Sequence, residues 1–407
     1  MSTTNLCLSP LVTSTASTTT VNGGAPTPQH QHSTTTTHLP KTGSLKSCKN
    51  VQELKQLHAQ LTKNRPTQSP QTLTNLIVSA CAEIATPESL EYARKAFNLN
   101  NYDETVSNTL YMLNCLIRGY SHAGLVDEAI RILLEMVTEG VAPDNFTFPF
   151  VLSACAKGVA YVEGIQIHGF IVKMGLGEDV FIENSLIHFY CECGEVGKGR
   201  KVFDEMPERN IVSWTSLICG YGRRDLPKEA VGLFFEMVEA GIRPNPVTMV
   251  CVISACAKLQ NLELAERVCG YIGESGLKVN TVLANALVDM YMKCGANDSA
   301  KRLFDECVDR NLVLYNTILS NYARQGLARE AFSIMNEMLR QGPPPDRVTL
   351  LSAISASAEL GDLLLGKQCH GYVLRNGFEG WDSISNVLID MYMNLLLPFA
   401  DIVIRCG

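Results

Sequence analysis

The stretch EMVTEGVAPD at residues 135–144 returns as EMVEAGIRPN at 236–245 and as EMLRQGPPPD at 337–346. Successive copies therefore lie 101 residues apart. Five sets of residues share that interval: Met136, Met237 and Met338; Gly140, Gly241 and Gly342; Pro143, Pro244 and Pro345; Asn184, Asn285 and Asn386; Tyr190, Tyr291 and Tyr392. Self-similarity at a constant interval indicates a repeat architecture rather than two or three compact domains.

The interval is too long for one supersecondary unit, and it divides into 35, 35 and 31 residues. Eight consecutive units follow from this division: 110–144, 145–179, 180–210, 211–245, 246–280, 281–311, 312–346 and 347–381. The start of an incomplete 31-residue unit occupies 382–393. Positions are counted below from the first residue of each unit.

Each unit is predicted to be a helical hairpin, as the first one illustrates. Its first helix has an apolar stripe at helical spacing that comprises Leu113, Leu116, Ile117 and Tyr120. Its second helix has a stripe that comprises Ala129, Ile130, Leu133, Leu134 and Val137. Gly124 separates the helices, and Asp127 is placed to cap or charge the start of the second. Gly140 and Pro143 end it.

One hairpin of this size cannot bury both stripes, whereas stacked neighbours bury them as one continuous core. The sequence therefore predicts an all-α fold, a right-handed α-solenoid superhelix of stacked helix-turn-helix repeats. We expect function on its concave inner face.

Five motifs resemble those of the pentatricopeptide repeat (PPR) family: Leu116-Ile-Arg-Gly-Tyr120, Glu135-Met, Gly140-Val-Ala-Pro-Asp144, Phe203-Asp-Glu-Met-Pro207 and Asp289-Met-Tyr-Met-Lys-Cys-Gly295. The 35/35/31 alternation resembles the plant PLS subclass, in which P, L and S repeats follow one another. The resemblance covers 110–393 in register and extends weakly to 42–109, where it implies degenerate repeats with an insertion.

The resemblance implies binding of single-stranded RNA, with one base recognised per repeat. In the family, the fifth and last residues contact the Watson–Crick edge of a base through amides, hydroxyls and carboxylates. It assigns U to Asn114/Asp144 and Asn316/Asp346, A to Thr215/Asn245, and a pyrimidine, C more than U, to Asn184/Asn210 and Asn285/Asn311. The L-repeat pairs Pro149/Asp179, Val250/Asn280 and Leu351/Trp381 receive no base, so the expected RNA is 5′-U-n-Y-A-n-Y-U-n-3′.

The residue at position 2 wedges between bases in the family. Here it is Tyr111, Phe146, Phe181, Val212, Val247, Val282, Val313 or Val348. Core packing is the alternative role for these side chains, and helix capping is the alternative for Asp144 and Asp346. The change at position 5, from Asn114 to Thr215 to Asn316, favours base recognition because capping would not require it.

A formal net charge of −7 opposes indiscriminate binding to polyanions. Position 13, however, is cationic in five of the eight units, which would place a basic line along the groove. The predicted phosphate contacts are Lys157, Arg223, Lys258, Lys293 and Arg324, whereas the remaining units have His122, Glu192 and Glu359 there. Solvated helix ends are the alternative interpretation.

The first 41 residues have a different composition. Residues 1–40 contain 17 Ser or Thr and no Asp, Glu, Lys or Arg, which is typical of a disordered tail or an organellar transit peptide. Because mitochondrial presequences carry arginines, a chloroplast address is favoured over a mitochondrial one. His30 and His32 have no further ligands nearby, so no metal site is expected.

Catalytic chemistry has no support in the sequence. A zinc deaminase needs a His followed two residues later by Glu and a Cys-x-x-Cys, and neither pattern occurs. The fifteen cysteines are interpreted as buried thiols in a reducing compartment. After Met393 the Cys-Gly of earlier units becomes Leu395-Leu396, so 394–407 is interpreted as an aberrant tail of a truncated product. No membrane-spanning run is present.

The sequence therefore predicts a non-enzymatic, sequence-specific RNA-binding protein of plant organelles that needs no cofactor and no small-molecule substrate. Its expected role is specificity factor for C-to-U editing or related transcript processing, with a deaminase-bearing or other editing factor acting in trans. A protein-binding α-solenoid scaffold in an organelle is the alternative.

Overall fold

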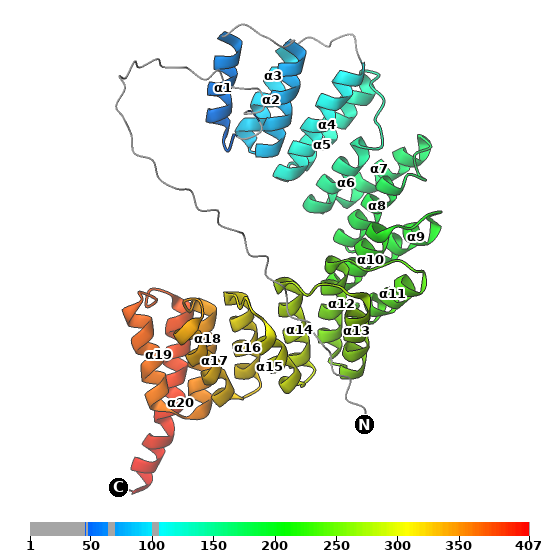
Figure 1. Cartoon of the computed structure of the whole chain (residues 1–407). Helices are drawn as coiled ribbons and strands as arrows, with labels where there is room; N and C mark the ends of the chain where they lie inside the picture. The colour runs from blue at the N-terminus through cyan, green and yellow to red at the C-terminus, as the bar shows by residue number, and fades with distance from the viewer. Residues whose placement is uncertain (1–44, 46–47, 64–69, 100–105, 407) are drawn as a thin grey trace, which may run out of the picture. The chain divides into compact units, whose positions relative to one another are not determined.

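The structure, a computed structural model, describes residues 45, 48–63, 70–99 and 106–406. Within these residues the chain forms twenty helices and no strand, which confirms the all-α repeat fold (Figure 1). The chain divides into two compact units, Met1–Pro143 and Asp144–Gly407. None of the described helices is both long and apolar enough to cross a membrane.

The first compact unit contains five helices in a stack. They are α1 (Val51–Lys63), α2 (Pro70–Ile84), α3 (Pro87–Leu99), α4 (Val106–Ala123) and α5 (Val126–Thr138). Helix α2 packs against α3 and α4, and α4 packs against α5. Helix α1 contacts α2 and also reaches α3, where His58 Nδ1 lies 2.6 Å from the hydroxyl of Tyr92. The degenerate region thus forms helices that stack like the later hairpins.

The second compact unit alternates first and second helices of successive hairpins. The first helices are α6 (Thr147–Gly158), α8 (Val180–Glu192), α10 (Ile211–Arg223), α12 (Pro246–Leu259), α14 (Thr281–Lys293), α16 (Leu312–Arg324), α18 (Arg347–Leu360) and α20 (Asp382–Cys406). The second helices are α7 (Tyr161–Lys173), α9 (Val196–Glu205), α11 (Pro227–Glu239), α13 (Leu262–Ser275), α15 (Asn297–Glu306), α17 (Ala328–Gln341) and α19 (Leu363–Arg375).

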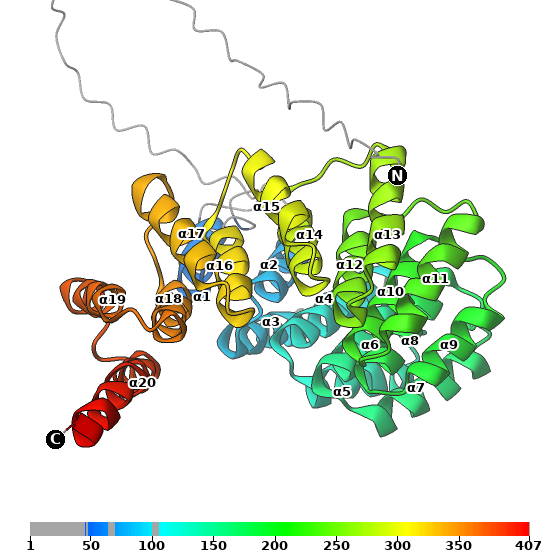
Figure 2. The ribbon, with the colours of Figure 1, turned by 90° about the horizontal axis from the view of Figure 1, so that it is seen from below.

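Packing within this unit follows one rule. Each first helix contacts the first helices of its neighbours, in unbroken succession from α6 to α20, and each second helix contacts the first helix of its own hairpin (Figure 1; Figure 2). The first helices therefore form a continuous layer in which equivalent residues of successive repeats lie along one line. This layer positions the candidate site.

The ten-residue stretch that recurs every 101 residues contains the end of a second helix. In two of its three copies a glycine with positive φ ends that helix. Gly140 and Gly241 have φ of +75°, and the next amides, of Val141 and Ile242, donate to the carbonyls of Met136 and Met237 at 2.8 and 3.1 Å. The third copy differs because Pro343 follows Gly342 and has no N–H to donate. There Gly342 is not left-handed, and its own amide bonds to the Met338 carbonyl at 2.8 Å.

The predicted second stripe of the first hairpin is partly wrong. Ala129 and Leu133 are buried as expected, but Leu134 and Val137 are exposed. Ile132 and Met136 are buried in the core instead, two residues before Leu134 and one residue before Val137, respectively. Asp127 lies in the first turn of α5 but makes no cap, because the residue preceding that helix is Leu125. Its charge still favours the helix N-terminus.

Tyrosines that recur at 101 residues are anchored by the preceding second helix. The Tyr190 and Tyr392 hydroxyls lie 2.7 and 3.0 Å from Nδ1 of His168 and His370. Burial lowers the pKa of His168, so it is neutral at physiological pH. Each pair satisfies two polar groups inside the stack.

The end of the chain is helical. Helix α20 runs from Asp382 to Cys406, across the point after Met393 at which the 101-residue register ends. In earlier units Gly194 and Gly295 adopt positive φ and end the first helix. Leu396 stands at the place that corresponds to both glycines, and leucine favours continuation of the helix there.

One pair of cysteines departs from the interpretation of buried thiols. Cys219 of α10 and Cys251 of α12 form a disulfide with their Cα atoms 5.4 Å apart. Eleven other cysteines of the described residues are thiols outside this disulfide. Burial raises the pKa of several of them, that of Cys155 to about 12, so they are unreactive thiols.

Candidate nucleic-acid interface

The side chains at position 2 form an exposed apolar row on the first helices. Exposed fractions range from 44% for Val348 to 67% for Phe181. All eight predicted wedge residues are exposed: Tyr111, Phe146, Phe181, Val212, Val247, Val282, Val313 and Val348. The core-packing alternative for them is therefore wrong. Seven of these side chains lie at the starts of the first helices from α6 to α18, and Tyr111 lies within α4. Apolar side chains held in water in this way are a surface on which flat bases can stack.

In seven of the eight repeats the last residue caps the first helix of the next repeat, whereas the repeat 347–381 ends with Trp381. Asp179, Asn210, Asn245, Asn280, Asn311 and Asp346 accept hydrogen bonds from backbone amides in the first turns of α8, α10, α12, α14, α16 and α18, respectively. Asp144 accepts in the same way from the amides of Phe146 and Thr147, at 3.0 and 2.9 Å. Capping is thus a real role of these residues. It uses one side-chain oxygen and fixes where the other polar atom points.

The fifth-position side chains lie next to these caps in two repeats of the second compact unit. Asn316 Nδ2 donates to Asp346 Oδ1 at 3.0 Å, and Asn184 Nδ2 donates to Asn210 Oδ1 at 3.4 Å. Two predicted pairs of the second compact unit show no direct bond among the described contacts: Thr215 and Asn245 are bridged by Thr248, and no bond joins Asn285 to Asn311. Asn114 and Asp144 belong to different compact units.

Several fifth-position amides keep an unpaired buried oxygen. The side-chain oxygens of Asn184 and Asn285 are buried and have no hydrogen-bond partner within the described part of the protein. Asn75 of α2 has the same property, and its Nδ2 donates to Asn108 Oδ1 at 2.7 Å. A buried polar atom without a partner costs free energy unless a ligand or water satisfies it.

Sequence reasoning missed the residues at position 3. Ser213, Thr248 and Thr349 are fully buried, and each hydroxyl bonds to the capping residue that precedes it. The signal was present as Asn or Asp followed three residues later by Ser or Thr, a capping-box pattern. Two of these boxes are complete, at Asn210/Ser213 and Asp346/Thr349.

Position 13 lies in the last turn of the first helices. Lys157, Arg223, Lys258, Lys293 and Arg324 all stand there, so the structure aligns them as the spacing predicts. The prediction of a simple basic line omitted their acidic neighbours. Arg223 pairs with Glu192, Lys258 with Asp225 at 3.1 Å, and Lys293 with Asp289 at 2.7 Å.

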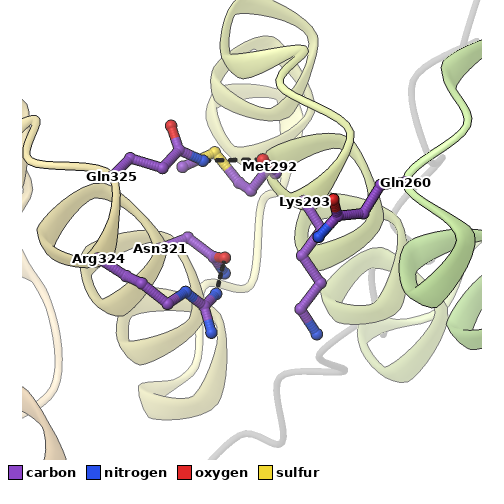
Figure 3. A pocket seen from close by; sticks show the side chains of 6 residues that line it. All are labelled: Gln260, Met292, Lys293, Asn321, Arg324 and Gln325. Carbon is purple, nitrogen blue, oxygen red and sulfur yellow. Dashed lines mark hydrogen bonds between the residues drawn. The ribbon is translucent and has the colours of Figure 1, made fainter.

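An open pocket of about 270 Å³ lies among the ends of α12, α14 and α16. Figure 3 shows Lys293 and Arg324 beside it, and its other lining residues are Gln260, Met292, Asn321 and Gln325. Two cationic side chains and two glutamine amides therefore surround one cavity. Such donors suit an anionic oxygen better than an apolar ligand.

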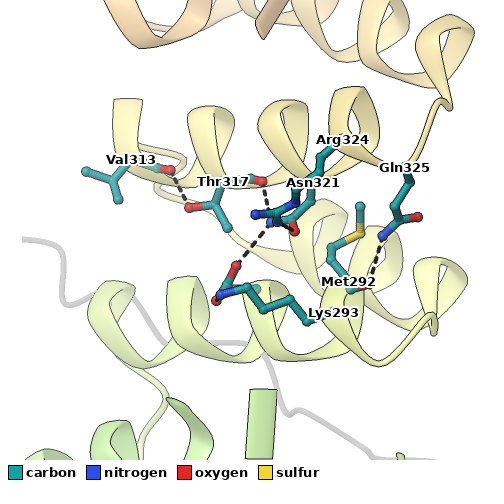
Figure 4. A network of polar contacts seen from close by, with 8 residues as sticks. Met292, Lys293, Val313, Thr317, Asn321, Arg324 and Gln325 are labelled. Carbon is teal, nitrogen blue, oxygen red and sulfur yellow. Dashed lines mark hydrogen bonds and ion pairs between the residues drawn. The ribbon is translucent and has the colours of Figure 1, made fainter. Parts of the chain in front are cut away.

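Buried contacts between α14 and α16 hold this pocket in shape (Figure 4). The buried Asn321 side chain donates to Asp289 at 3.1 Å and to the Thr317 carbonyl at 2.8 Å, and it accepts from Arg324. Gln325 donates to the Met292 carbonyl at 2.8 Å. The arginine head is thereby oriented by a side chain that is itself fixed.

Two carboxyl groups on the first-helix layer have shifted pKa values. Burial raises the pKa of Asp346, but hydrogen bonds from Thr349 and Asn316 outweigh it, so the pKa lies below its ordinary value. Burial and the nearby Asp179 raise the pKa of Glu183, whose Oε2 has no hydrogen-bond partner among the residues that the structure describes. Asp346 is therefore a pure acceptor at physiological pH.

The described residues contain no group of three or more His, Cys, Asp or Glu side chains that could hold a metal ion.

Known proteins share this repeat. Sequence profiles of the PPR repeat family match residues 109–157, 209–258 and 310–358, and the PPR repeat profile matches 184–211 and 282–312. The pentatricopeptide repeat-containing protein At3g22690 of Arabidopsis thaliana is 56% identical over 352 residues, which cover 86% of this chain and 41% of the relative. The putative pentatricopeptide repeat-containing protein At3g05240 of the same plant is 35% identical over 364 residues, 87% of this chain and 63% of the relative.

Solved structures show the same fold. The crystal structure of the pentatricopeptide repeat protein PPR10 in complex with an 18-nt psaJ RNA element matches with a TM-score of 0.68 and 18% identity, and covers 88% of this chain and 53% of that one. The crystal structure of PPR10 from maize matches with a TM-score of 0.51 and 18% identity, and covers 87% of this chain and 55% of that one. The chain thus spans about half the length of the proteins it matches. With its profile matches, its relatives and its stacked hairpins, this chain belongs to the pentatricopeptide repeat family.

Proposed function

We propose that this protein binds single-stranded RNA sequence-specifically along the layer of first helices, with one base per repeat. The proposal rests on the exposed apolar side chains at position 2, because each of the eight repeats exposes an apolar side chain to solvent there. Stacking on aromatic and apolar side chains is how proteins hold unpaired bases. The RNA in the PPR10 complex supports the choice of ligand.

Donors and acceptors beside that row supply discrimination. In the repeat 312–346, Asn316 Nδ2 donates one of its two protons to Asp346 Oδ1, and the other proton remains available to a base. Asp346 Oδ2 adds an acceptor. Uracil has an N3–H donor flanked by carbonyl oxygens, so one donor and one acceptor match its edge. The pair therefore fits the assignment of U.

Backbone contacts would come from position 13. The ion pairs that engage Arg223, Lys258 and Lys293 are exposed or half-buried, and such pairs contribute only about 0–1 kcal/mol. A phosphate can replace the carboxylate partner at little cost. The pocket beside Lys293 and Arg324 offers room for one phosphate group.

The cellular role that we infer is a specificity factor for C-to-U editing or related processing of organellar transcripts, with a catalytic factor acting in trans. The 35/35/31 alternation, which resembles the PLS subclass, supports it. A Ser/Thr-rich N-terminus without charge supports a chloroplast destination over a mitochondrial one.

Thr215→Asn tests the proposed register. It converts the fifth- and last-position pair of the repeat 211–245 from Thr/Asn to Asn/Asn, the pair found in 180–210 and 281–311. Gel-shift titrations with the predicted RNA and with a version that has C in place of A are expected to show a switch of preference from A to C. Thr138→Asn, on an exposed end of α5, is the matched control. A variant that keeps the wild-type preference would contradict the register.

A further inference from the structure

Two buried threonines connect a fifth-position side chain to the last-position side chain of the same repeat. Thr248 Oγ1 lies 2.7 Å from Thr215 Oγ1 and 3.0 Å from Asn245 Oδ1. Thr349 Oγ1 lies 2.6 Å from Asn316 Oδ1 and 2.9 Å from Asp346 Oδ1. Both threonines are fully buried, so neither hydroxyl can touch RNA itself.

The two partners of the Thr248 hydroxyl determine the direction of its hydrogen bonds. Asn245 Oδ1 can only accept, so Thr248 donates to it and must accept from Thr215. The Thr215 proton is consequently directed inward, and a lone pair faces an approaching base. Adenine presents an amino donor at the place where guanine presents a carbonyl oxygen. This orientation of the hydroxyl favours A over G.

Thr349 acts on an amide instead of a hydroxyl. Asn316 Oδ1 and Asp346 Oδ1 can only accept, so they share the single Thr349 hydroxyl proton, and the shorter contact, 2.6 Å against 2.9 Å, holds the Asn316 oxygen inward. Asn316 Nδ2, held by Asp346 Oδ1, is then the atom that can meet a base. Uracil presents a carbonyl oxygen where cytosine presents an amino group. This orientation favours U over C.

We propose that Thr248 and Thr349 are positioning residues that determine base specificity: where the position-3 hydroxyl reaches the fifth residue, it decides whether that residue offers a donor or an acceptor. The inference rests on the proposed RNA binding and adds to it a specificity determinant in the following repeat. Ser213 marks the contrast. Its hydroxyl bonds to Asn210 at 3.3 Å, while Asn184 Oδ1 has no partner.

Thr349→Val tests the inference in the full chain. Its hydroxyl is lost at nearly constant shape, so Asn316 can turn its oxygen toward the base. Fluorescence anisotropy with four RNAs that differ only opposite the repeat 312–346 is expected to show the U-over-C affinity ratio fall by about fivefold. Thr349→Ser keeps the hydroxyl and is expected to restore the wild-type ratio.

Ser213→Ala is the matched control. It removes an equally buried capping-box hydroxyl that does not reach the fifth residue, so thermal stability is expected to fall while the U-to-C ratio opposite 180–210 stays unchanged. A purely structural role of Thr349 would lower stability in the same way and leave the base ratio intact.

The outcomes separate the two proposals. A Thr349→Val variant that binds RNA with the wild-type U-to-C ratio overturns the inference and leaves RNA binding standing. A wild-type chain that binds none of the four RNAs overturns the proposed function. If circular dichroism shows that Thr349→Val is unfolded, Thr248→Val replaces it as the test. A fall in the A-over-G affinity ratio opposite the repeat 211–245 supports the inference, and an unchanged ratio overturns it.

Discussion

At the scale of the residue, the recognition positions combine two duties. Asp346 ends a loop by capping α18 with one oxygen, and the same bonds orient it beside Asn316. Capping and base recognition were alternatives in the sequence, yet one short side chain can serve both because it has two polar atoms. The hydroxyl at position 3 of the next repeat also contacts these side chains, and a comparison of the fifth and last residues alone does not reveal it.

Replacement of a wedge residue separates binding from folding. Phe181→Ala is expected to weaken RNA binding by about 1–3 kcal/mol through lost base stacking. Its effect on unfolding is expected to stay within about 0.5 kcal/mol, because the ring is exposed. The adjacent Ile182→Ala is the control, and its fully buried side chain makes a loss of stability of about 2–5 kcal/mol the expected result. Calorimetry with RNA and urea unfolding measure the two quantities.

The carboxyl group of Glu183 is expected to make the free energy of unfolding depend on pH. Its folded-state pKa is raised by burial and by Asp179, so its contribution to stability is greatest below its ordinary value of 4.5 and is lost as pH rises through the folded value. Glu183→Gln is expected to raise the free energy of unfolding at pH 7 by about 1 kcal/mol. Urea unfolding at pH 4 and pH 7 tests this expectation. A difference in unfolding free energy between variant and wild type that does not grow with pH would contradict the raised pKa of Glu183.

At the scale of the element, periodicity predicted the hairpins but not every face. Leu134 and Val137 fit an apolar stripe as well as Ile132 and Met136 do, because several helical registers share apolar residues. Packing against neighbouring helices chooses among them. Likewise, Cys219 and Cys251 are 32 residues apart in sequence, and only the stacking of α10 on α12 brings them together.

Helices α7 and α8 approach closely at a glycine. A Cβ on Gly164 would lie 2.0 Å from the Phe189 ring, whereas a Cβ on Gly169 of the same helix would meet nothing within 4 Å. Gly164→Ala is therefore expected to destabilise the protein by about 1–3 kcal/mol through overpacking. Gly169→Ala is expected to stabilise it by about 0.5–1 kcal/mol. Thermal unfolding compares them, and equal effects of the two alanines would contradict the close contact.

At the scale of the whole molecule, an acidic chain can bind a polyanion if cations recur once per repeat. The residue counts predicted a net charge of −7 and the cations at position 13, but they could not show that Glu192, Asp225 and Asp289 pair with three of them. Partners for surface charges depend on which helix ends meet. These contacts come from tertiary stacking and leave no local signal in the sequence.

The salt dependence of binding tests the contribution of position 13. Replacement of Arg223, Lys258, Lys293 and Arg324 by Gln is expected to lower the slope of log affinity against log salt by about 3 for single-stranded RNA. Glutamine avoids new carboxylates beside Glu192 and Asp289. A matched set on second helices, Lys201, Lys228, Arg302 and Arg329 to Gln, is expected to leave the slope unchanged. Equal slopes for both quadruple variants would exclude the basic line.

The central proposal is ordered recognition of one base per repeat, and competition binding of the full chain tests it most directly. Labelled RNA with the order 5′-U-n-Y-A-n-Y-U-n-3′ is displaced by unlabelled RNA of the same order or by a scrambled RNA of identical composition. We predict that the ordered RNA competes at least about tenfold better, the equivalent of one or two lost base contacts. Equal competition by the two RNAs, or no binding of either, would contradict it.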